Sequence, residues 1–158
     1  MSRFEQPSED NGFLAPHVAI LRHSLRHWTR RELVDPHMSD EEAARFLFHA
    51  PFVVVSHDTQ PEPVFNYANR TALNLFAMDW EEFTALPSRL SAEEVKREER
   101  EESLRKVAEQ GYIDRYQAVR IGRHGRRFRI EDAVVWNLLD ANGAPYGQAA
   151  LFERWTYL

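Results

Sequence analysis

Seven aromatic or amide side chains are the first candidates for chemistry in this sequence, because they could line a cavity and orient a bound molecule. They are Tyr67, Phe76, Trp80, Phe83, Phe128, Trp136 and Gln148. Small-molecule sites are mostly apolar and aromatic, with a few polar groups that orient the ligand. Asn137 is a second amide, and the two-residue period of a strand lets only one of Trp136 and Asn137 face such a pocket. We expect a ligand pocket here, with a filled aromatic core as the alternative.

Histidines supply weaker candidates. His23 and His27 lie four residues apart on a predicted helix, a spacing that can bind a metal, but no third ligand accompanies them. We therefore expect no metal site. His57 and Asp58 lie at the end of a predicted strand, where a turn is the simpler interpretation and catalysis the alternative.

Basic side chains crowd one predicted hairpin, residues 120–129. They are Arg120, Arg123, His124, Arg126, Arg127 and Arg129. Hydrated charges that face nearby carboxylates are the simpler interpretation, and binding of an anionic ligand or partner is the alternative. The role of this hairpin stays open at this point.

The composition excludes several classes of chemistry. The 158 residues include no cysteine, which rules out disulfides, thiolate metal sites, cysteine nucleophiles and any cysteinyl photoadduct. No glycine-rich phosphate loop, zinc-protease motif or nucleophile elbow occurs. We therefore expect no enzymatic activity. A small enzyme that uses His57, Asp58 or the hairpin arginines is the least favoured alternative.

Charge and hydropathy limit the partners. The net charge of −5 does not favour nucleic-acid binding. Apolar runs such as residues 52–55 are far too short to span a bilayer, and residues 1–10 carry no apolar signal-peptide core. We expect a cytoplasmic protein that binds neither membrane nor nucleic acid.

Periodicity predicts a helical N-terminal extension, residues 13–50, after a disordered tail over residues 1–12. Apolar residues recur every three or four positions across Ala15–Trp28, as on one face of an amphipathic helix. The stretch Ser39–Glu42 is a capping box that starts a short second helix.

The remaining residues, 51–158, alternate between strands and short helices. Strands are predicted at 52–56, 64–67, 112–121, 127–139 and 147–157, and helices at 69–76, 80–83 and 91–110. Asn69 is interpreted as the structural cap of the first of these helices. Alternation along the fourth strand places a set of apolar side chains on one face, namely Phe128, Ile130, Val134, Trp136 and Leu138.

These elements predict an α+β fold, a five-stranded antiparallel sheet with short helices on one face. The strands carry apolar residues on both faces, so both sides of the sheet should be covered. The amphipathic helix over residues 15–31 is left to cover the second face, or to pair with another copy of the chain in a homodimer.

The order of elements resembles a PAS-type sensory domain, and several stretches sharpen the resemblance. Pro63-Val-Phe-Asn-Tyr-Ala-Asn69, followed by Thr71-Ala-Leu-Asn-Leu-Phe76, is similar to the PAS pattern in which a strand ends at an Asn that caps the next helix. Other stretches resemble the MEKHLA domain over residues 15–157: Gly125-Arg-Arg-Phe128, Val135-Trp-Asn-Leu138, Asp140, Gly143 and Gly147-Gln-Ala-Ala. MEKHLA is a PAS-like domain found alone in bacterial proteins and at the C-terminus of some plant homeodomain–leucine zipper proteins.

The resemblance implies a sensory or regulatory domain over residues 51–158. Such a domain binds an unidentified small molecule between its sheet and its short helices, and signals through a dimer change or a separate output protein. The alternative is a ligand-free interaction or dimerisation module. The stretch Trp136–Leu139 is similar to a strand motif of light-oxygen-voltage domains but lies out of register with it, so no flavin-binding residues are carried over. Haem ligation has no local support, and the cofactor is unknown.

Overall fold

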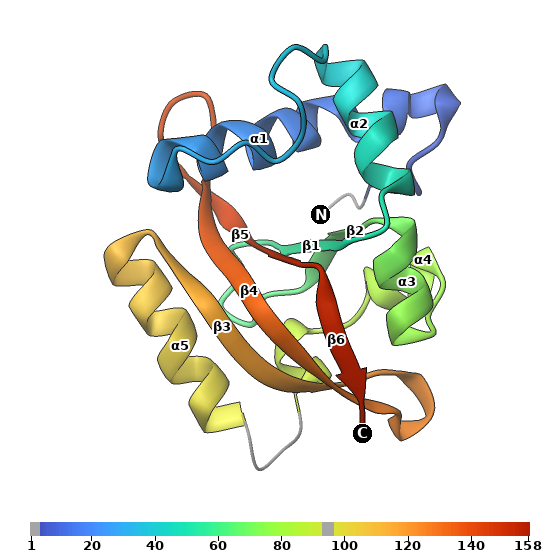
Figure 1. Cartoon of the computed structure of the whole chain (residues 1–158), viewed down its shortest axis with the longest axis vertical. Coiled ribbons are helices and arrows are strands. Elements are labelled where there is room, and N and C mark those ends of the chain that lie inside the picture. The colour runs from blue at the N-terminus through green and yellow to red at the C-terminus, as the bar shows by residue number, and fades with distance from the viewer. Residues whose placement is uncertain (1–3, 93–96) are drawn as a thin grey trace.

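The structure is a computed structural model that describes residues 4–92 and 97–158 (Figure 1). Within these residues, six strands form one antiparallel sheet in the order β2-β1-β5-β4-β3, with β6 paired to β4. The strands are β1 (Val53–His57), β2 (Phe65–Ala68), β3 (Tyr112–Ile121), β4 (Arg127–Leu139), β5 (Pro145–Phe152) and β6 (Arg154–Tyr157). This is the predicted α+β architecture with one strand more, because the last predicted strand is interrupted at Glu153.

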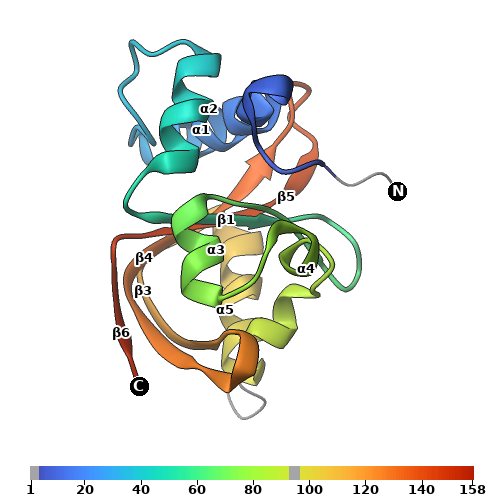
Figure 2. The ribbon, with the colours of Figure 1, turned by 90° about the vertical axis from the view of Figure 1, so that its right-hand side faces the viewer.

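Helices lie on both faces of this sheet (Figure 2). They are α1 (Ala15–Thr29), α2 (Asp40–His49), α3 (Arg70–Phe76), α4 (Trp80–Phe83) and α5 (Arg97–Gln110), with single 3-10 turns at η1 (Glu9–Leu14), η2 (Ser88–Ser91) and η4 (Arg123–Gly125). Two of them begin at the predicted caps. Ser39 Oγ accepts from Glu42 N at 3.1 Å, and Asn69 Oδ1 accepts from Ala72 N at 3.1 Å.

The long charged helix predicted over residues 91–110 is described as α5 from Arg97, because residues 93–96 lie outside the described part of the chain. It lies along β3 (Figure 1). Among the described helices, none is long and apolar enough to cross a membrane.

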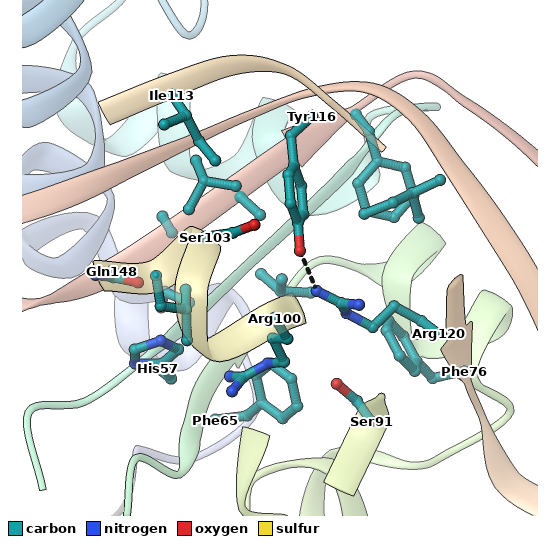
Figure 3. A pocket seen from close by; sticks show the side chains of 18 residues that line it. His57, Phe65, Phe76, Ser91, Arg100, Ser103, Ile113, Tyr116, Arg120 and Gln148 are labelled. Atoms are coloured by element: carbon teal, nitrogen blue, oxygen red, sulfur yellow. Dashed lines mark hydrogen bonds between the residues drawn. The ribbon is translucent and has the colours of Figure 1, made fainter. Parts of the chain in front are cut away.

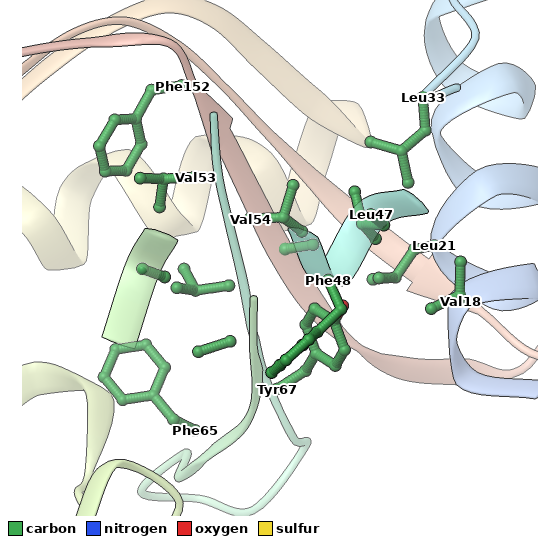
Figure 4. Close-up of a cluster of buried hydrophobic side chains, with 14 of the residues drawn as sticks. Val18, Leu21, Leu33, Leu47, Phe48, Val53, Val54, Phe65, Tyr67 and Phe152 are labelled. Carbon is green, nitrogen blue, oxygen red and sulfur yellow. The ribbon is translucent and has the colours of Figure 1, made fainter. Parts of the chain in front are cut away.

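α1 and α2 cover one face of the sheet with their apolar sides. Val18 and Leu21 of α1 are fully buried, and Leu25 is 1% exposed. In Figure 4, Val18, Leu21 and Leu33 lie on one side of β1, and Val53 points to the other side. The apolar side of α1 therefore packs inside the chain, so it is not available for the homodimer that the sequence offers as an alternative.

A buried chain of hydrogen bonds ties α1 to the sheet. His17 Nε2 lies 2.9 Å from Ser56 Oγ, and Ser56 Oγ donates to Asn66 Oδ1 at 2.5 Å. His17 must then donate through Nε2, which leaves Nδ1 as the acceptor for the hydroxyl of Tyr146 at 3.2 Å. Burial lowers the pKa of His17 to about 4, so the ring is neutral at neutral pH.

The N-terminal segment differs from the disordered tail that the sequence predicts over residues 1–12. Residues 1–3 lie outside the described part. From Phe4 onward the segment contacts the fold: the Phe4 ring lies 5.2 Å from the His17 ring, and Phe4 O accepts from Trp80 Nε1 at 2.9 Å. A buried indole N–H needs an acceptor, and this backbone carbonyl supplies one.

Two residues with left-handed backbone interrupt the alternation of the central strands. Arg115 in β3 has φ +52° and Asp132 in β4 has φ +53°, and the β3–β4 pairing shifts register beside Arg115. Ile130 and Val135 line one cavity although they are five residues apart. Uninterrupted alternation would place them on opposite faces, so the irregularity between them moves the later side chains to the other face.

Because of the irregular backbone at Asp132, the residues after it in β4 lie on the face opposite to the predicted one. The Phe128 ring lies 5.1 Å from the Phe76 ring of α3. Further along the strand, Asn137 Nδ2 donates to Val107 O of α5 at 3.0 Å, so Asn137 points to the same side as Phe128. Trp136 therefore points toward α1. The prediction that Trp136 shares a face with Phe128 is wrong.

Acidification should weaken the attachment of α1 through His17. The folded-state pKa lies below the ordinary value of 6.5, so this stabilisation is present above pH 6.5 and is lost as the pH falls toward 4. Between about pH 7 and about pH 5, the wild type should lose about 2 kcal/mol more unfolding free energy than the variant His17→Gln. Urea unfolding at both pH values measures this difference. Exposed His23→Gln is the control, and equal losses in wild type and His17→Gln would contradict the assignment.

The left-handed backbone of Asp132 gives a second prediction. Valine favours strands but tolerates positive φ poorly, whereas glycine adopts it freely. Asp132→Val should therefore be less stable than Asp132→Gly by about 1–2 kcal/mol in urea unfolding. A valine variant that is the more stable of the two would show that the strand is regular at this point.

Candidate functional site

A small cavity lies on the face of the sheet that α3 and α5 cover (Figure 3). Its volume is about 70 Å³. Strand pairing assembles a polar row on its floor, because Gln148 of β5 lies opposite both His57 of β1 and Asn137 of β4. The lining residues with polar side chains are Ser56, His57, Ser91, Arg100, Ser103, Tyr116, Arg120 and Gln148.

α5 contributes Arg100 to this cavity, although most of the helix is charged and exposed. Arg100, Ser103, Leu104 and Val107 recur at the three- and four-residue spacing of one helix face. Arg100 is 7% exposed and Val107 is fully buried, so this face packs toward the sheet. A guanidinium is thereby carried into the interior beside the cavity.

Two arginines line the cavity wall. Arg100 Nη2 donates to Ser88 Oγ at 2.5 Å, and Arg120 Nη2 donates to Tyr116 Oη at 2.9 Å. Burial, and then the neighbouring charge of Arg120, lower the pKa of Arg100 to about 10, so it stays charged at neutral pH. The ion pairs between described residues include none with Arg100 or Arg120. The wall therefore carries two positive charges without a described ion pair, although the Glu101 carboxylate, beyond ion-pair distance, partly offsets the charge of Arg100.

Two hydrogen-bond acceptors on the cavity floor also lack a partner. His57 Nδ1 lies 2.9 Å from Asp58 O, and a carbonyl only accepts, so Nδ1 carries the proton and Nε2 is an acceptor in the neutral ring. Burial lowers the pKa of His57, which favours this neutral form. Within the described residues, neither His57 Nε2 nor Gln148 Oε1 makes a hydrogen bond of ordinary distance and angle, although both are buried and the Gln148 side chain lies close enough to His57 to act on its pKa. Such atoms are rare in native proteins unless water or a ligand satisfies them.

Asn137 connects the floor of the cavity to both helical layers. Its Nδ2 donates to Val107 O of α5 at 3.0 Å, and its Oδ1 accepts from Gln148 Nε2 at 3.0 Å. Its backbone oxygen accepts from Trp28 Nε1 of α1 at 2.9 Å. Gln148 is therefore linked to α5 through the side chain of Asn137 and to α1 through the backbone of Asn137.

The structure brings two of the seven predicted pocket residues to the cavity, Phe76 and Gln148. Phe83 and Phe128 do not line it. Their rings pack around Phe76, with centroids 5.3 Å and 5.1 Å from the Phe76 ring. These rings form part of the core that supports the cavity.

The other three predicted residues lie elsewhere. Tyr67 stacks on His17 of α1 with ring centroids 5.5 Å apart, and Trp136 also points toward α1. Trp80 donates its indole N–H to the backbone of Phe4. The structure therefore does not gather the seven residues around one space.

Most of the polar wall is not foreseen from the sequence. From the sequence alone, His57 and Arg120 are interpreted as residues of a turn and of a hydrated hairpin. The sequence assigns no role to Arg100 or Tyr116. The burial of Arg100 could have been predicted from the sequence, because Arg100 lies on the same face of the helix as Val107. The position of Tyr116 could not, because the irregular backbone beside it reverses the face of β3.

Two further hollows border the cavity. One, of about 80 Å³, shares Arg100, Ser103, Tyr116 and Arg120 with it. The other, of about 350 Å³, shares His57 and Gln148 with it and runs beneath the loop that begins at Asp58.

A separate groove of about 470 Å³ lies between Phe4, Tyr146 and the loop after β1. None of the unpaired buried polar atoms of the described residues belongs to a residue that lines it. Its size alone does not indicate a ligand.

Comparison with known proteins identifies the family. The family model of the MEKHLA domain matches residues 15–157. Homeobox-leucine zipper protein HOX29 of Oryza sativa subsp. indica is 24% identical over 126 residues, and the match covers 79% of this chain. The chain spans only 15% of the length of that relative.

Solved structures with a similar fold include a PAS domain of a protein from Colwellia psychrerythraea. It has a TM-score of 0.60 and 16% identity, over 73% of this chain and 92% of that one. A fungal light-oxygen-voltage photoreceptor has a TM-score of 0.60 and 13% identity, over 96% of this chain and 100% of that one. An RNA-binding light-oxygen-voltage receptor has a TM-score of 0.62 and 16% identity, over 75% and 34%. At these identities the likeness shows the fold alone, and that fold is PAS-like.

A flavin does not fit the cavity of this chain. Sites for drug-sized ligands have volumes of about 300–1,000 Å³, whereas this cavity has about 70 Å³. Its walls also carry Arg100 and Arg120 in place of an apolar slot for three fused rings. With no cysteine in the sequence, the residues offer neither the space nor the thiol for a photoadduct.

Removing the side-chain amide of Asn137 should destabilise the protein. Asn137→Leu keeps a similar volume but leaves Gln148 Nε2 without a partner, at a cost of about 1–3 kcal/mol for that group. It also removes one of the two hydrogen bonds to Val107 O, which keeps only the bond from Gly111 N at 2.7 Å. We expect a loss of about 2 kcal/mol or more in urea unfolding. Asn74→Leu, at an exposed position of α3, is the matched control. Equal stabilities of the two variants would show that these hydrogen bonds do not hold α5 on the sheet.

Proposed function

The chain belongs to the MEKHLA domain family of PAS-like domains, and we propose that it is a sensory domain that binds a small molecule in the cavity between the sheet and α5. The bound molecule changes the packing of the helices, and a partner protein or a second copy of the chain reads that change. The role is regulatory and not catalytic.

One observation carries this proposal: two of the four buried polar atoms that lack a partner among the described residues border the same cavity as a buried guanidinium. His57 Nε2, Gln148 Oε1 and the charged Arg100 all border this cavity, and each is held in place by hydrogen bonds through its other atoms. The other two atoms, Tyr67 Oη and Trp136 Nε1, lie in the packed core and border no part of this cavity. Polar groups that are fixed in position and still unpaired can bind and orient a ligand.

A route for the signal follows from the strand geometry. Neighbouring residues of a strand point to opposite faces, so β1 presents His57 to the cavity and Ser56 to His17 of α1. Asn137 makes a second such link through Trp28. Both links end on α1, which supports α1 as the element that moves when the cavity is occupied.

Nothing favours the alternative of a dimerisation module built on residues 15–31, because the apolar residues of α1 are buried against the sheet. An enzyme that joins His57, Asp58 and the hairpin arginines is not supported either. Asp58 does not line the cavity, and of the hairpin arginines only Arg120 does.

Filling the cavity should abolish retention of the ligand. Ala150 faces the cavity from β5, so Ala150→Leu and Ala150→Phe place extra carbon atoms inside it. Native mass spectrometry should detect a small molecule on the wild type, either after purification or after incubation with a small-molecule extract of the host cells. The molecule should be absent from the Ala150 variants and present on Ala141→Phe, which changes an exposed turn.

Circular dichroism establishes that each variant is folded, and Ala150→Leu serves if the larger Phe disrupts the core. A wild type that retains nothing under either condition contradicts the proposal. So does a folded Ala150→Leu variant that retains as much as the wild type.

A further inference from the structure

We propose that the ligand of this cavity is a short carboxylate, bound by Arg100 and Arg120. This inference rests on the proposed function for the existence of a ligand and adds its chemical class.

The two buried arginines of the described chain provide the first step. Arg22 and Arg100 are 8% and 7% exposed. Arg22 is fully satisfied: Nη1 bonds to the Asp40 carboxylate at 2.9 Å, and Nη2 bonds to two backbone carbonyls. Arg100 bonds to the Ser88 hydroxyl and to no described carboxylate. A buried charge is expensive unless an opposite charge accompanies it, so Arg100 lacks the partner that Arg22 has.

Arg120 adds a second positive charge that has no described ion-pair partner. It lines the same cavity as Arg100, and the charges of the two guanidiniums repel each other. Tyr116 Oη accepts one hydrogen bond from Arg120 but carries no charge to offset it. Glu93 and Glu94 lie outside the described residues. An anion between the two guanidiniums would turn a repulsive pair into two attractive contacts, and a carboxylate matches the planar donor fork of arginine.

The size of the space limits the anion. An engineered cavity of about 150 Å³ holds benzene, with its six carbon atoms, and this cavity has about half that volume. Roughly three or four non-hydrogen atoms fit by that comparison, which is the size of acetate. An adjoining hollow of about 80 Å³ shares the two arginines with the cavity.

The walls next to the arginines select against a fully charged ion such as phosphate. Phe65, Phe76, Leu104 and Ile130 line the same cavity and leave one side of it apolar. A short carboxylate presents a charged end to the arginines and a carbon chain to these side chains.

Acetate and acetamide test the charge requirement, because they have nearly the same shape and differ in charge. The thermal unfolding midpoint of the full chain is measured with each compound at millimolar concentration, and with sodium chloride at matched ionic strength. Acetate should raise the midpoint of the wild type above the value in sodium chloride, and acetamide should not. Titration calorimetry of acetate with Arg100→Gln and Arg120→Gln should show an affinity at least about tenfold weaker than for the wild type. Arg129→Gln, at an exposed position of β4, should bind as the wild type does.

The results separate this inference from the proposed function. If acetate has no effect beyond that of sodium chloride, or protects Arg100→Gln and Arg120→Gln equally well, the carboxylate assignment is wrong. The sensory proposal then still stands if the wild type retains a molecule that Ala150→Leu does not. Stabilisation by acetamide that is equal to that by acetate would indicate a neutral ligand in the same cavity and would likewise overturn the assignment. Loss of both acetate binding and retention would overturn both proposals.

Discussion

The coverage of both sheet faces is the constraint on which the rest of this structure depends. With α1 and α2 on one face and α3 to α5 on the other, the polar side chains of the central strands are shielded from water and need partners inside the protein. On the α1 face His17, Ser56, Asn66 and Tyr146 bond in one chain, but Tyr67 Oη and Trp136 Nε1 are buried there without a partner among the described residues. On the opposite face the requirement is also met only in part. There His57, Gln148 and Arg100 line one cavity, and we propose that their unmet hydrogen-bonding capacity makes this cavity a ligand site.

The order and type of the elements were predictable from the sequence, because they depend on local signals. Ser39 and Asn69 cap their helices as their sequence context indicates. The sheet face to which a strand side chain points was less predictable. A single residue with left-handed backbone reverses the face of every later residue in that strand. Asp132 makes this change in β4 and sends Trp136 to α1, and nothing in the sequence distinguishes it from other polar residues of a strand. Glu153 divides the last predicted strand into β5 and β6.

The candidate site was predictable only in part, and its charged wall shows why. Gln148 was predicted as a pocket residue because an amide is unusual in an apolar strand. Phe76 was predicted because it lies on the apolar face of its helix. Arg100 stands among many charged neighbours in a helix with a weak apolar stripe, so its burial depends on the docking of that helix against β3. The chain has a fold similar to that of light-oxygen-voltage domains but contains no thiol that could form a cysteinyl photoadduct. The arginine pair gives its cavity a different chemistry.

A nuclear magnetic resonance titration of the folded chain with acetate tests the central claim most directly, because it reports on each side chain of the cavity. The account predicts saturable shifts of the Nε–H signals of Arg100 and Arg120 and of the side-chain amide of Gln148. Smaller shifts should appear in α1, at the indole N–H of Trp28, through Asn137. Shifts confined to exposed arginines such as Arg126 and Arg129, or linear shifts that never saturate, would contradict the account.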